Sequence, residues 1–474
     1  MSETLKASLW SLYIVVITRL LYYITSIVIM TVLSPSNFGI IAITMAVIAI
    51  ANSMSSVGVD AALISHKKDI QYLLNSAWTF EIFRGLALFI LINLISEYLG
   101  ILYNESQLSE ILRVMSFTFI LYSLKNIGVV YLRKDLEFKG IFIYEISHLV
   151  VLTIVTLTVV LLTKSIWGIV AGYISGGVAL LLATYIVHPY RPKLEFSIVK
   201  FKILFSYSKW LLMAGQLNSI VEHGVTLFVG SMFDSKTLGQ YERADMFTRK
   251  TAIQMGEIIW KVGLPVLSKV SSNENDIQKT YGSMLRVVVG VFIPIMTLIS
   301  IFLPDFIVLF IGPEWGVLIS LIDELCILAS ISMLVLPSSI LFQAIGLPEI
   351  SFKVSLLRIF SILITIYPLV TWFDIHGVVY SLMIGAVLSI LMLLNNTRAY
   401  TRITHTMQLK IALPSIVSSL ILIYIFSNVE LFNSIGIIVN LLGAVALYLI
   451  LLYCLSNDYR KIFHNFVKMT LGKL

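Results

Sequence analysis

The chain has 474 residues, of which 58% are hydrophobic and only 12% are charged, and its mean hydropathy is +0.95. These values exclude a soluble globular protein and indicate a protein that crosses a membrane many times. The net charge of +7 lies mostly in short loops, where it contacts anionic lipid headgroups, so nucleic-acid binding is not predicted.

The sequence carries no pattern typical of a cofactor or metal centre. Cys326 and Cys454 lie in apolar segments far apart in the chain, so we expect buried thiols and no disulfide. There is no P-loop, zinc-binding spacing or nucleophile elbow. Primary ATP hydrolysis is therefore not predicted.

Hydrophobic segments follow one another along the whole chain. A hydrocarbon core of ~30 Å requires ~20 residues of helix, and most of the segments exceed that length. The sequence predicts fourteen spans, at residues 7–32, 38–64, 73–98, 107–132, 139–163, 166–188, 204–230, 237–265, 278–304, 317–345, 350–373, 376–396, 409–427 and 433–456.

The positive charges between these segments predict their orientation. Only Lys164 and Lys236 fall in loops on one side. Because positive charge is retained in the cytoplasm, we expect a multi-pass protein of the bacterial inner membrane with both termini cytoplasmic. The first segment has spanning length and no small-residue cleavage site, so it is expected to remain as a helix. The 20 residues expected inside are Lys6, Lys67, Lys68, Arg133, Lys134, Lys139, Arg191, Lys193, Lys200, Lys202, Lys269, Lys279, Lys353, Arg398, Arg402, Lys410, Arg460, Lys461, Lys468 and Lys473.

The chain also repeats itself at an offset near 200 residues. Residues 34–39 (SPSNFG) align with residues 234–239 (DSKTLG). Each repeat holds six predicted spans, so the two are parallel, and parallel repeats in transporters are related by an axis along the membrane normal. A second match, at an offset of 209, aligns Gly168, Val170 and Gly176 with Gly377, Val379 and Gly385.

We therefore expect an all-α integral membrane fold of two parallel six-helix lobes plus two C-terminal helices. The predicted divisions are an N-lobe at 1–190, a cytoplasmic linker at 191–203, a C-lobe at 204–400, and two extra helices with a cytoplasmic tail at 401–474. Every outside connection is about ten residues or fewer, so no extracytoplasmic domain is expected and the working surface must lie between helices.

Ionisable residues lie inside several predicted spans. Each costs roughly 2.5 to 3.5 kcal/mol at a helix centre on insertion scales, and such residues usually face a bundle interior or a hydrated cavity. Without the eighth span, Lys353 and every later cytoplasmic loop would lie outside, so the charge pattern requires that span. Its charged residues are Glu242, Arg243, Asp245, Arg249, Lys250, Glu257 and Lys261.

At about 100° per residue, one face of a regular helix over the eighth span is polar. We expect this face to line a hydrated cavity between the lobes, where its cations would attract a phosphate or pyrophosphate. The alternative is internal pairing, of Glu242 with Arg249, Glu257 with Lys261 and Glu81 with Arg84. The face carries Arg243, Lys250, Gln254, Glu257 and Lys261, and the candidate cavity residues are Arg19, Arg84, Lys125, Arg243, Arg249, Lys250, Glu257 and Lys261.

Glu222 and His223, in the outer half of the seventh span, are candidate groups for coupling transport to a proton, because histidine titrates near neutral pH. The alternative for them is a cavity-facing pair with no role in transport.

Five short segments within the first 350 residues carry a resemblance to a known family. They are 33–39 (LSPSNFG), 58–64 (GVDAALI), 167–172 (WGIVAG), 190–197 (YRPKLEFS) and 238–244 (LGQYERA). In spacing and position they resemble segments of the Wzx-type polysaccharide exporters of the colanic-acid and teichuronic-acid kind. The resemblance implies the MOP flippase superfamily, with two six-helix lobes around a V-shaped cationic cavity. It also implies a function: outward movement of undecaprenyl-pyrophosphate-linked oligosaccharide for O-antigen, capsule or exopolysaccharide.

Within these motifs, Arg243 is the position that the resemblance carries over to the cavity. Asp60 stands where relatives often have a small residue, so no role is carried over for it. The partners implied are the lipid-linked oligosaccharide, membrane lipids, a coupling proton or sodium ion, and a polysaccharide polymerase.

Two other classes stay open. A multidrug antiporter of the same superfamily would share the architecture, but with a cavity dominated by carboxylates, whereas spans one, four and eight here lean basic. A membrane polysaccharide polymerase or ligase would need a long outside loop, which the predicted topology lacks.

Overall fold

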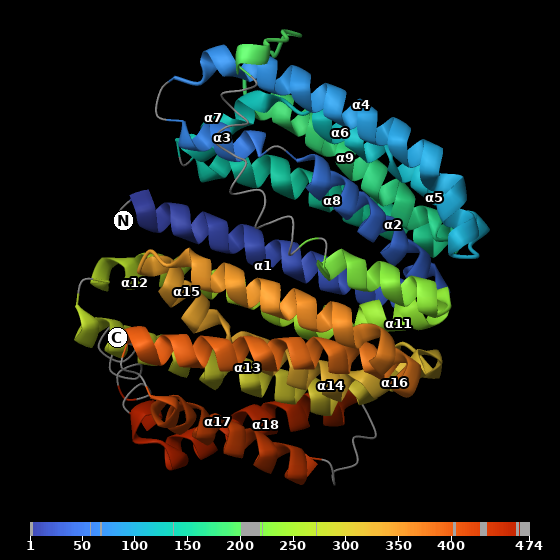
Figure 1. Ribbon diagram of the computed structural model, residues 1–474. Coiled ribbons are helices and arrows are strands. Elements are labelled where there is room, and N and C mark those ends of the chain that lie inside the picture. The colour runs from blue at the N-terminus through green and yellow to red at the C-terminus, as the bar shows by residue number, and fades with distance from the viewer. Residues whose placement is uncertain are drawn as a thin grey trace. The chain divides into compact units, whose positions relative to one another are not determined.

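The computed structural model describes residues 3–56, 58–66, 69–135, 137–200, 219, 221–271, 273–401, 404–426, 434–460 and 464. All regular secondary structure in these residues is helical (Figure 1). The start of the predicted seventh span, residues 204–218, lies outside the described residues. So do the loop residues Lys67, Lys68, Lys202, Arg402, Lys461, Lys468 and Lys473.

The chain divides into two compact units, Met1–Gly239 and Gln240–Leu474. Within the first unit, α1 packs on α8, α8 on α9, and α4 on α5 and α6. Its helices are α1 (Glu3–Met30), α2 (Pro35–Ser55), α3 (Val59–Ser65), α4 (Gln71–Leu102), α5 (Ser106–Met115), α6 (Phe117–Ser123), η1 (Ile127–Val129), α7 (Val130–Lys134), α8 (Phe138–Thr163) and α9 (Trp167–Val187), followed by helical residues 221–232.

In the second unit, the long helix α13 packs against α12, α14, α17 and α18. A π-helical turn, η2 (Met246–Lys250), separates α11 (Ser235–Asp245), which begins in the first unit, from α12 (Thr251–Val270). The other helices are α13 (Glu274–Phe310), η3 (Pro313–Trp315), α14 (Gly316–Leu334), α15 (Leu336–Ala344), α16 (Pro348–Thr401), α17 (His405–Phe426) and α18 (Ser434–Leu455).

The expectation of an all-helical membrane protein is confirmed. By length and apolar composition, eight helices of the described chain can cross a membrane, or nine if one bent pair is counted as a span. The full arrangement of fourteen spans stays a prediction. The charged stretch α11–η2–α12 is not among the eight. Helix α16, which holds two predicted spans, is interrupted at Phe373 and Asp374, where Asp374 has φ 50°.

Two helices of the first unit are broken, and both breaks have a local cause. Helix α2 ends at Ser55, and α3 starts after Gly58, whose φ of 65° is a conformation that favours glycine. Further along, the pair formed by residues 106–123 and 127–134 bends by 65°. The polar side chains described next lie around these two breaks.

The start of α2 and the start of α11 pack together with no room for side chains. A β-carbon added to Gly39 would lie 1.9 Å from the carbonyl oxygen of Ser235. Two helix backbones approach this closely only where the contact residues are glycines or other small residues. The internal sequence match therefore coincides with a direct backbone contact.

Candidate functional site

Asn126 organises the break in the fourth predicted span. Its side-chain amide donates to the carbonyl oxygens of Tyr190 (2.8 Å), His188 (3.0 Å) and Thr184 (3.4 Å), and its side-chain oxygen accepts from Gly128 N (2.9 Å). The residue is fully buried. One side chain thus ties the broken helix to the end of α9 and to the segment that follows it.

The neighbouring backbone groups freed by the break are also satisfied. The carbonyl of Leu124 accepts from the hydroxyl of Tyr185 (3.2 Å), and that of Lys125 accepts from the indole N–H of Trp78 (3.1 Å). Broken helices are tolerated at membrane depth where neighbouring groups replace the lost backbone bonds. The frame that carries the Lys125 side chain is therefore well defined.

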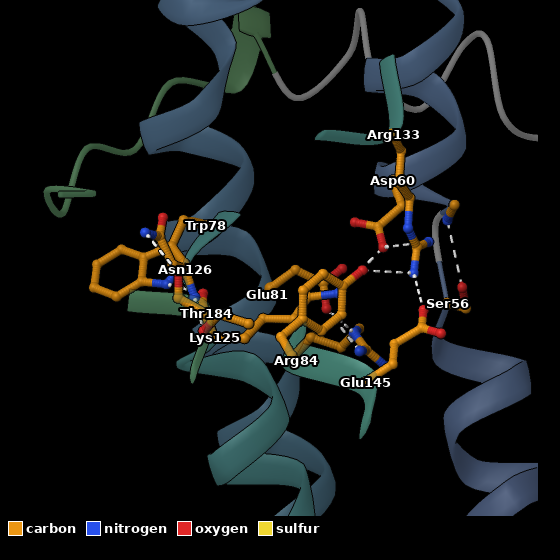
Figure 2. A network of polar contacts seen from close by, with 12 residues as sticks. Ser56, Asp60, Trp78, Glu81, Arg84, Lys125, Asn126, Arg133, Glu145 and Thr184 are labelled. Carbon is orange, nitrogen blue, oxygen red and sulfur yellow. Dashed lines mark hydrogen bonds and ion pairs between the residues drawn. The ribbon is translucent and has the colours of Figure 1, made fainter. Parts of the chain in front are cut away.

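The side chain of Lys125, in the break between α6 and η1, belongs to a charge network with residues of α3, α7 and α8 (Figure 2). Lys125 Nζ lies 3.1 Å from Asp60 Oδ2, and Arg133 Nη1 lies 3.9 Å from the same oxygen. Arg133 Nη2 also donates to the hydroxyl of Tyr144 (3.2 Å) and to Glu145 Oε1 (3.5 Å). One carboxylate oxygen of α3 therefore lies between a cation of the broken span and a cation of α7.

Arg84 lies in the same view but is held much more tightly (Figure 2). Its Nε and Nη2 donate to Glu81 Oε2 at 2.9 and 2.6 Å, which confirms the expected pair of Glu81 with Arg84. Its Nη1 donates to Asn52 Oδ1 (2.9 Å) and Ser55 Oγ (3.1 Å). These contacts fix the end of α2 onto α4 and leave Arg84 little capacity for a ligand.

An apolar cluster supports the network. Val59 and Leu63 of α3 pack with Leu74 of α4 and with Ile127 and Val130 of the broken span, and all five are buried. In a membrane protein, close packing of such side chains stabilises helix association through van der Waals contact. The relative positions of α3, α4, η1 and α7 thus depend on apolar packing as well as on the charges.

The second charged region is the stretch α11–η2–α12. Glu242 pairs with Lys250 at 2.6 Å, and Arg249 pairs with Asp245 through two contacts of 2.6 Å. Glu242 and Asp245 are buried. The partner of Glu242 is therefore Lys250, and not Arg249 as the internal-pairing alternative expected.

The π turn explains the assignment. Such a turn adds one residue to a helix and rotates everything after it by about 100°. Glu242 and Lys250 would be about 80° apart on a regular helix but come within about 20° across the turn. By the same rotation Arg243 and Lys250, which would be about 20° apart on a regular helix, come to lie about 120° apart. The prediction of a single polar face, which assumed a regular helix, is therefore wrong.

Beyond the turn, Glu257 and Lys261 are exposed and form no ion pair with each other in the described part of the chain. Arg243 is half-buried and donates to the sulfur of Met246 at 3.3 Å. Arg19 is half-buried in α1, as are Glu222 and His223 in helical residues 221–232. Of the candidate cavity residues, the structure thus brings Arg249 and Lys250 together at Asp245. Lys125 lies in a separate network, where it contacts Asp60.

The network includes residues that were not predicted as site residues, among them Asp60, Asn126 and Arg133. The sequence places Arg133 in a cytoplasmic loop, one residue past the fourth predicted span. The polar pair Lys125–Asn126 followed by Gly128, within an apolar segment, was the available signal for the break.

Comparison with known proteins places the chain in a family. Residues 8–320 match the family described as "Polysaccharide biosynthesis protein", which is more than half of the 474 residues. The chain belongs to this family. A relative, the lipopolysaccharide biosynthesis protein WzxC of Escherichia coli (strain K12), is 23% identical over 76% of this chain and 73% of its own length. The resemblance to Wzx-type proteins is therefore confirmed.

Solved structures identify the fold. The inward closed conformation of the lipid II flippase MurJ aligns with a TM-score of 0.73 at 16% identity, over 97% of this chain and 100% of that chain. An inward-facing multidrug resistance MATE family transporter of the MOP superfamily aligns with a TM-score of 0.62 at 16% identity, over 81% and 95%. The fold is that of the MOP superfamily, shared by this flippase and this transporter.

Proposed function

We propose that this polysaccharide biosynthesis protein is a flippase that exports undecaprenyl-pyrophosphate-linked oligosaccharide repeat units from the cytoplasmic to the outer leaflet of the bacterial inner membrane. The units would serve O-antigen, capsule or exopolysaccharide assembly. Family membership and the similarity to WzxC support the polysaccharide pathway. The MurJ-like fold supports movement of a lipid-linked substrate.

The observation that carries the proposal is the charged stretch α11–η2–α12. Between positions 242 and 261 it holds four cations against three carboxylates, and the carboxylates of the two formed pairs are buried. Hydrocarbon would not tolerate such a helix on a lipid-facing surface. A helix of this kind is suited to a hydrated cavity with excess positive charge, which would receive a pyrophosphate.

The proposed architecture is two parallel six-helix lobes, residues 1–190 and 204–400, with helices 13 and 14 outside the repeat. The packing of Gly39 against Ser235, at positions that the internal repeat relates, supports it. Parallel repeats allow alternating access by rocking of one lobe against the other. The half-buried Glu222 and His223 stay candidates for proton coupling, and a sodium ion is the other coupling ion proposed.

The test is deletion of the gene in a strain without a redundant exporter. Lipid-linked repeat units should accumulate in the cytoplasmic leaflet, and the surface glycan should be lost. Normal surface glycan in that strain would overturn the proposal. Raised drug sensitivity with intact glycan would instead favour the multidrug antiporter.

Complementation with variants at matched membrane abundance tests the cavity. The Arg243→Gln, Lys250→Gln double variant should fail to restore surface glycan, because charge-assisted contacts to the phosphates are lost. Lys353→Gln, at the predicted cytoplasmic edge of α16, is the matched control and should restore it. Full export by the double variant would refute the cationic cavity while leaving the assignment to the pathway in place.

A further inference from the structure

We propose that Lys125 and Arg133 form a second anion-binding site, outside the α11–α12 stretch, in which the carboxylate of Asp60 occupies the place of a phosphate group. The ligand class is a phosphate or pyrophosphate, carried by a lipid or free in solution. Its identification with the substrate's pyrophosphate rests on the proposed function. The binding site itself does not.

Asp60 Oδ2 contacts Lys125 Nζ at 3.1 Å and Arg133 Nη1 at 3.9 Å (Figure 2). A single oxygen between an ammonium and a guanidinium is the arrangement that a phosphate oxygen adopts when two cations bind it. A phosphate brings further oxygens and can engage the planar fork of an arginine through two parallel bonds.

The two arginines of the network differ in their exposure and in the lengths of their contacts. Arg84 is 17% exposed, and its four contacts all lie between 2.6 and 3.1 Å. Arg133 is 42% exposed, and its contacts to Asp60, Glu145 and Tyr144 lie between 3.2 and 3.9 Å. Long contacts on an accessible guanidinium are weaker than short ones on a buried guanidinium. Arg133 can therefore exchange its partners for an incoming anion, whereas Arg84 cannot without losing the contacts that fix α2.

The two cations are carried by a fixed frame. The apolar cluster of Val59, Leu63, Leu74, Ile127 and Val130 holds together the helices that carry Asp60 and Arg133, and Asn126 fixes the break through four hydrogen bonds of its side chain. The cations thus keep their positions when Asp60 is displaced. A preorganised pair of cations with a replaceable internal anion is a binding site that stays charge-balanced when empty.

The site predicts an unusual sign for a neutralising substitution. In Asp60→Asn the competing charge is gone while the size is kept, so binding of inorganic pyrophosphate should tighten about tenfold. The measurement is titration calorimetry on the full chain in nanodiscs of phosphatidylcholine. The matched control is Glu97→Gln. Glu97 pairs with Arg113 at 3.3 Å, so this variant also removes one carboxylate from an arginine pair, but it should leave the affinity for pyrophosphate unchanged.

Adding Lys125→Gln and Arg133→Gln to the Asp60→Asn variant should abolish the gain. In the otherwise unchanged chain, Arg133→Gln should weaken pyrophosphate binding and Arg113→Gln should not, a comparison that does not depend on the folding of Asp60→Asn. Equal affinities for Asp60→Asn, Glu97→Gln and the natural chain would overturn the site. A gain that survives loss of both cations would overturn it as well.

Repeating the titration in nanodiscs that contain phosphatidylglycerol distinguishes the sources of phosphate. If the lipid suppresses the gain, an anionic headgroup reaches the site, and if the gain persists, the site selects phosphates other than bulk lipid. The two proposals can fail separately. If deletion of the gene leaves the surface glycan intact but Asp60→Asn still binds pyrophosphate more tightly, the proposed function fails and the binding site stands.

Discussion

Gly39 and Gly239 face each other backbone to backbone. A β-carbon on Gly239 would lie 2.8 Å from the backbone nitrogen of Gly39 and 1.9 Å from the carbonyl oxygen of Pro35. The contact is reciprocal: Gly39 meets Ser235 just as Gly239 meets Pro35, and each residue is matched with its counterpart by the offset of 200. The two segments are thus related locally by an approximate two-fold axis.

This contact predicts the effect of adding a methyl group. Gly39→Ala and Gly239→Ala should each lower the thermal unfolding midpoint of the purified protein, because the helices must separate. Overpacking of this kind costs about 1 to 3 kcal/mol. Gly316→Ala, where a β-carbon would meet nothing within 4 Å, is the control. Unchanged midpoints in all three variants would contradict the close approach.

Asn126→Ala should be among the most destabilising polar substitutions in the first unit. It removes the three bonds donated by the buried amide and the acceptor of Gly128 N, and each such bond contributes about 0.5 to 1.5 kcal/mol. Arg191 still donates to the carbonyls of His188 and Tyr190. Asn396→Ala is the comparison, since within the described residues that half-buried amide donates to Met392 of its own helix and to no other group. The thermal midpoints should fall much further for Asn126→Ala, and a similar fall in both would show that the break is held by other contacts.

The pair of Glu242 with Lys250 can be tested by exchanging its charges. Glu242→Lys or Lys250→Glu alone places like charges together at 2.6 Å spacing and should destabilise the protein. The double exchange should recover part of the loss, with a coupling of about 0.5 to 3 kcal/mol. The readout is the unfolding midpoint of the four proteins. Additive effects would place Glu242 and Lys250 apart and argue against the π turn.

Reporter fusions test the predicted fourteen spans. Fusions should report cytoplasm at Lys134, Pro192 and Lys353, and outside at Asn37 and Glu314, because alternate loops carry the positive charge. Loss of α11–α12 as a span would turn Lys353 outward. An outside signal at Lys353 would therefore remove the two-lobe proposal.

The sequence predicted helices best where apolar residues are uninterrupted. Helix α8 begins at Phe138, against a predicted start at 139, and α18 ends at Leu455, against 456. The predicted span 107–132 ran through the break at Asn126, because hydropathy does not register how backbone groups are satisfied by Tyr185 and Trp78.

The charged pairs were harder to predict because they depend on helix geometry. The pair of Glu81 with Arg84 follows from spacing alone and was correct. The partners of Arg249 and Lys250 depend on the π turn, which no residue pattern in Met246–Lys250 indicates. Asp60 and Arg133 are 73 positions apart, and only the folded chain shows that they meet.

The π turn also affects how this chain is compared with its relatives. The π turn holds one residue more than the same turn of a regular helix. A relative with a regular helix at this place therefore aligns with this chain only if a single-residue gap is set between Met246 and Lys250. An alignment without that gap would match Glu257 and Lys261 with residues on another side of the relative's helix. Conservation scores for α12 would then be computed over columns that mix two faces, and the gap must be set from the structure.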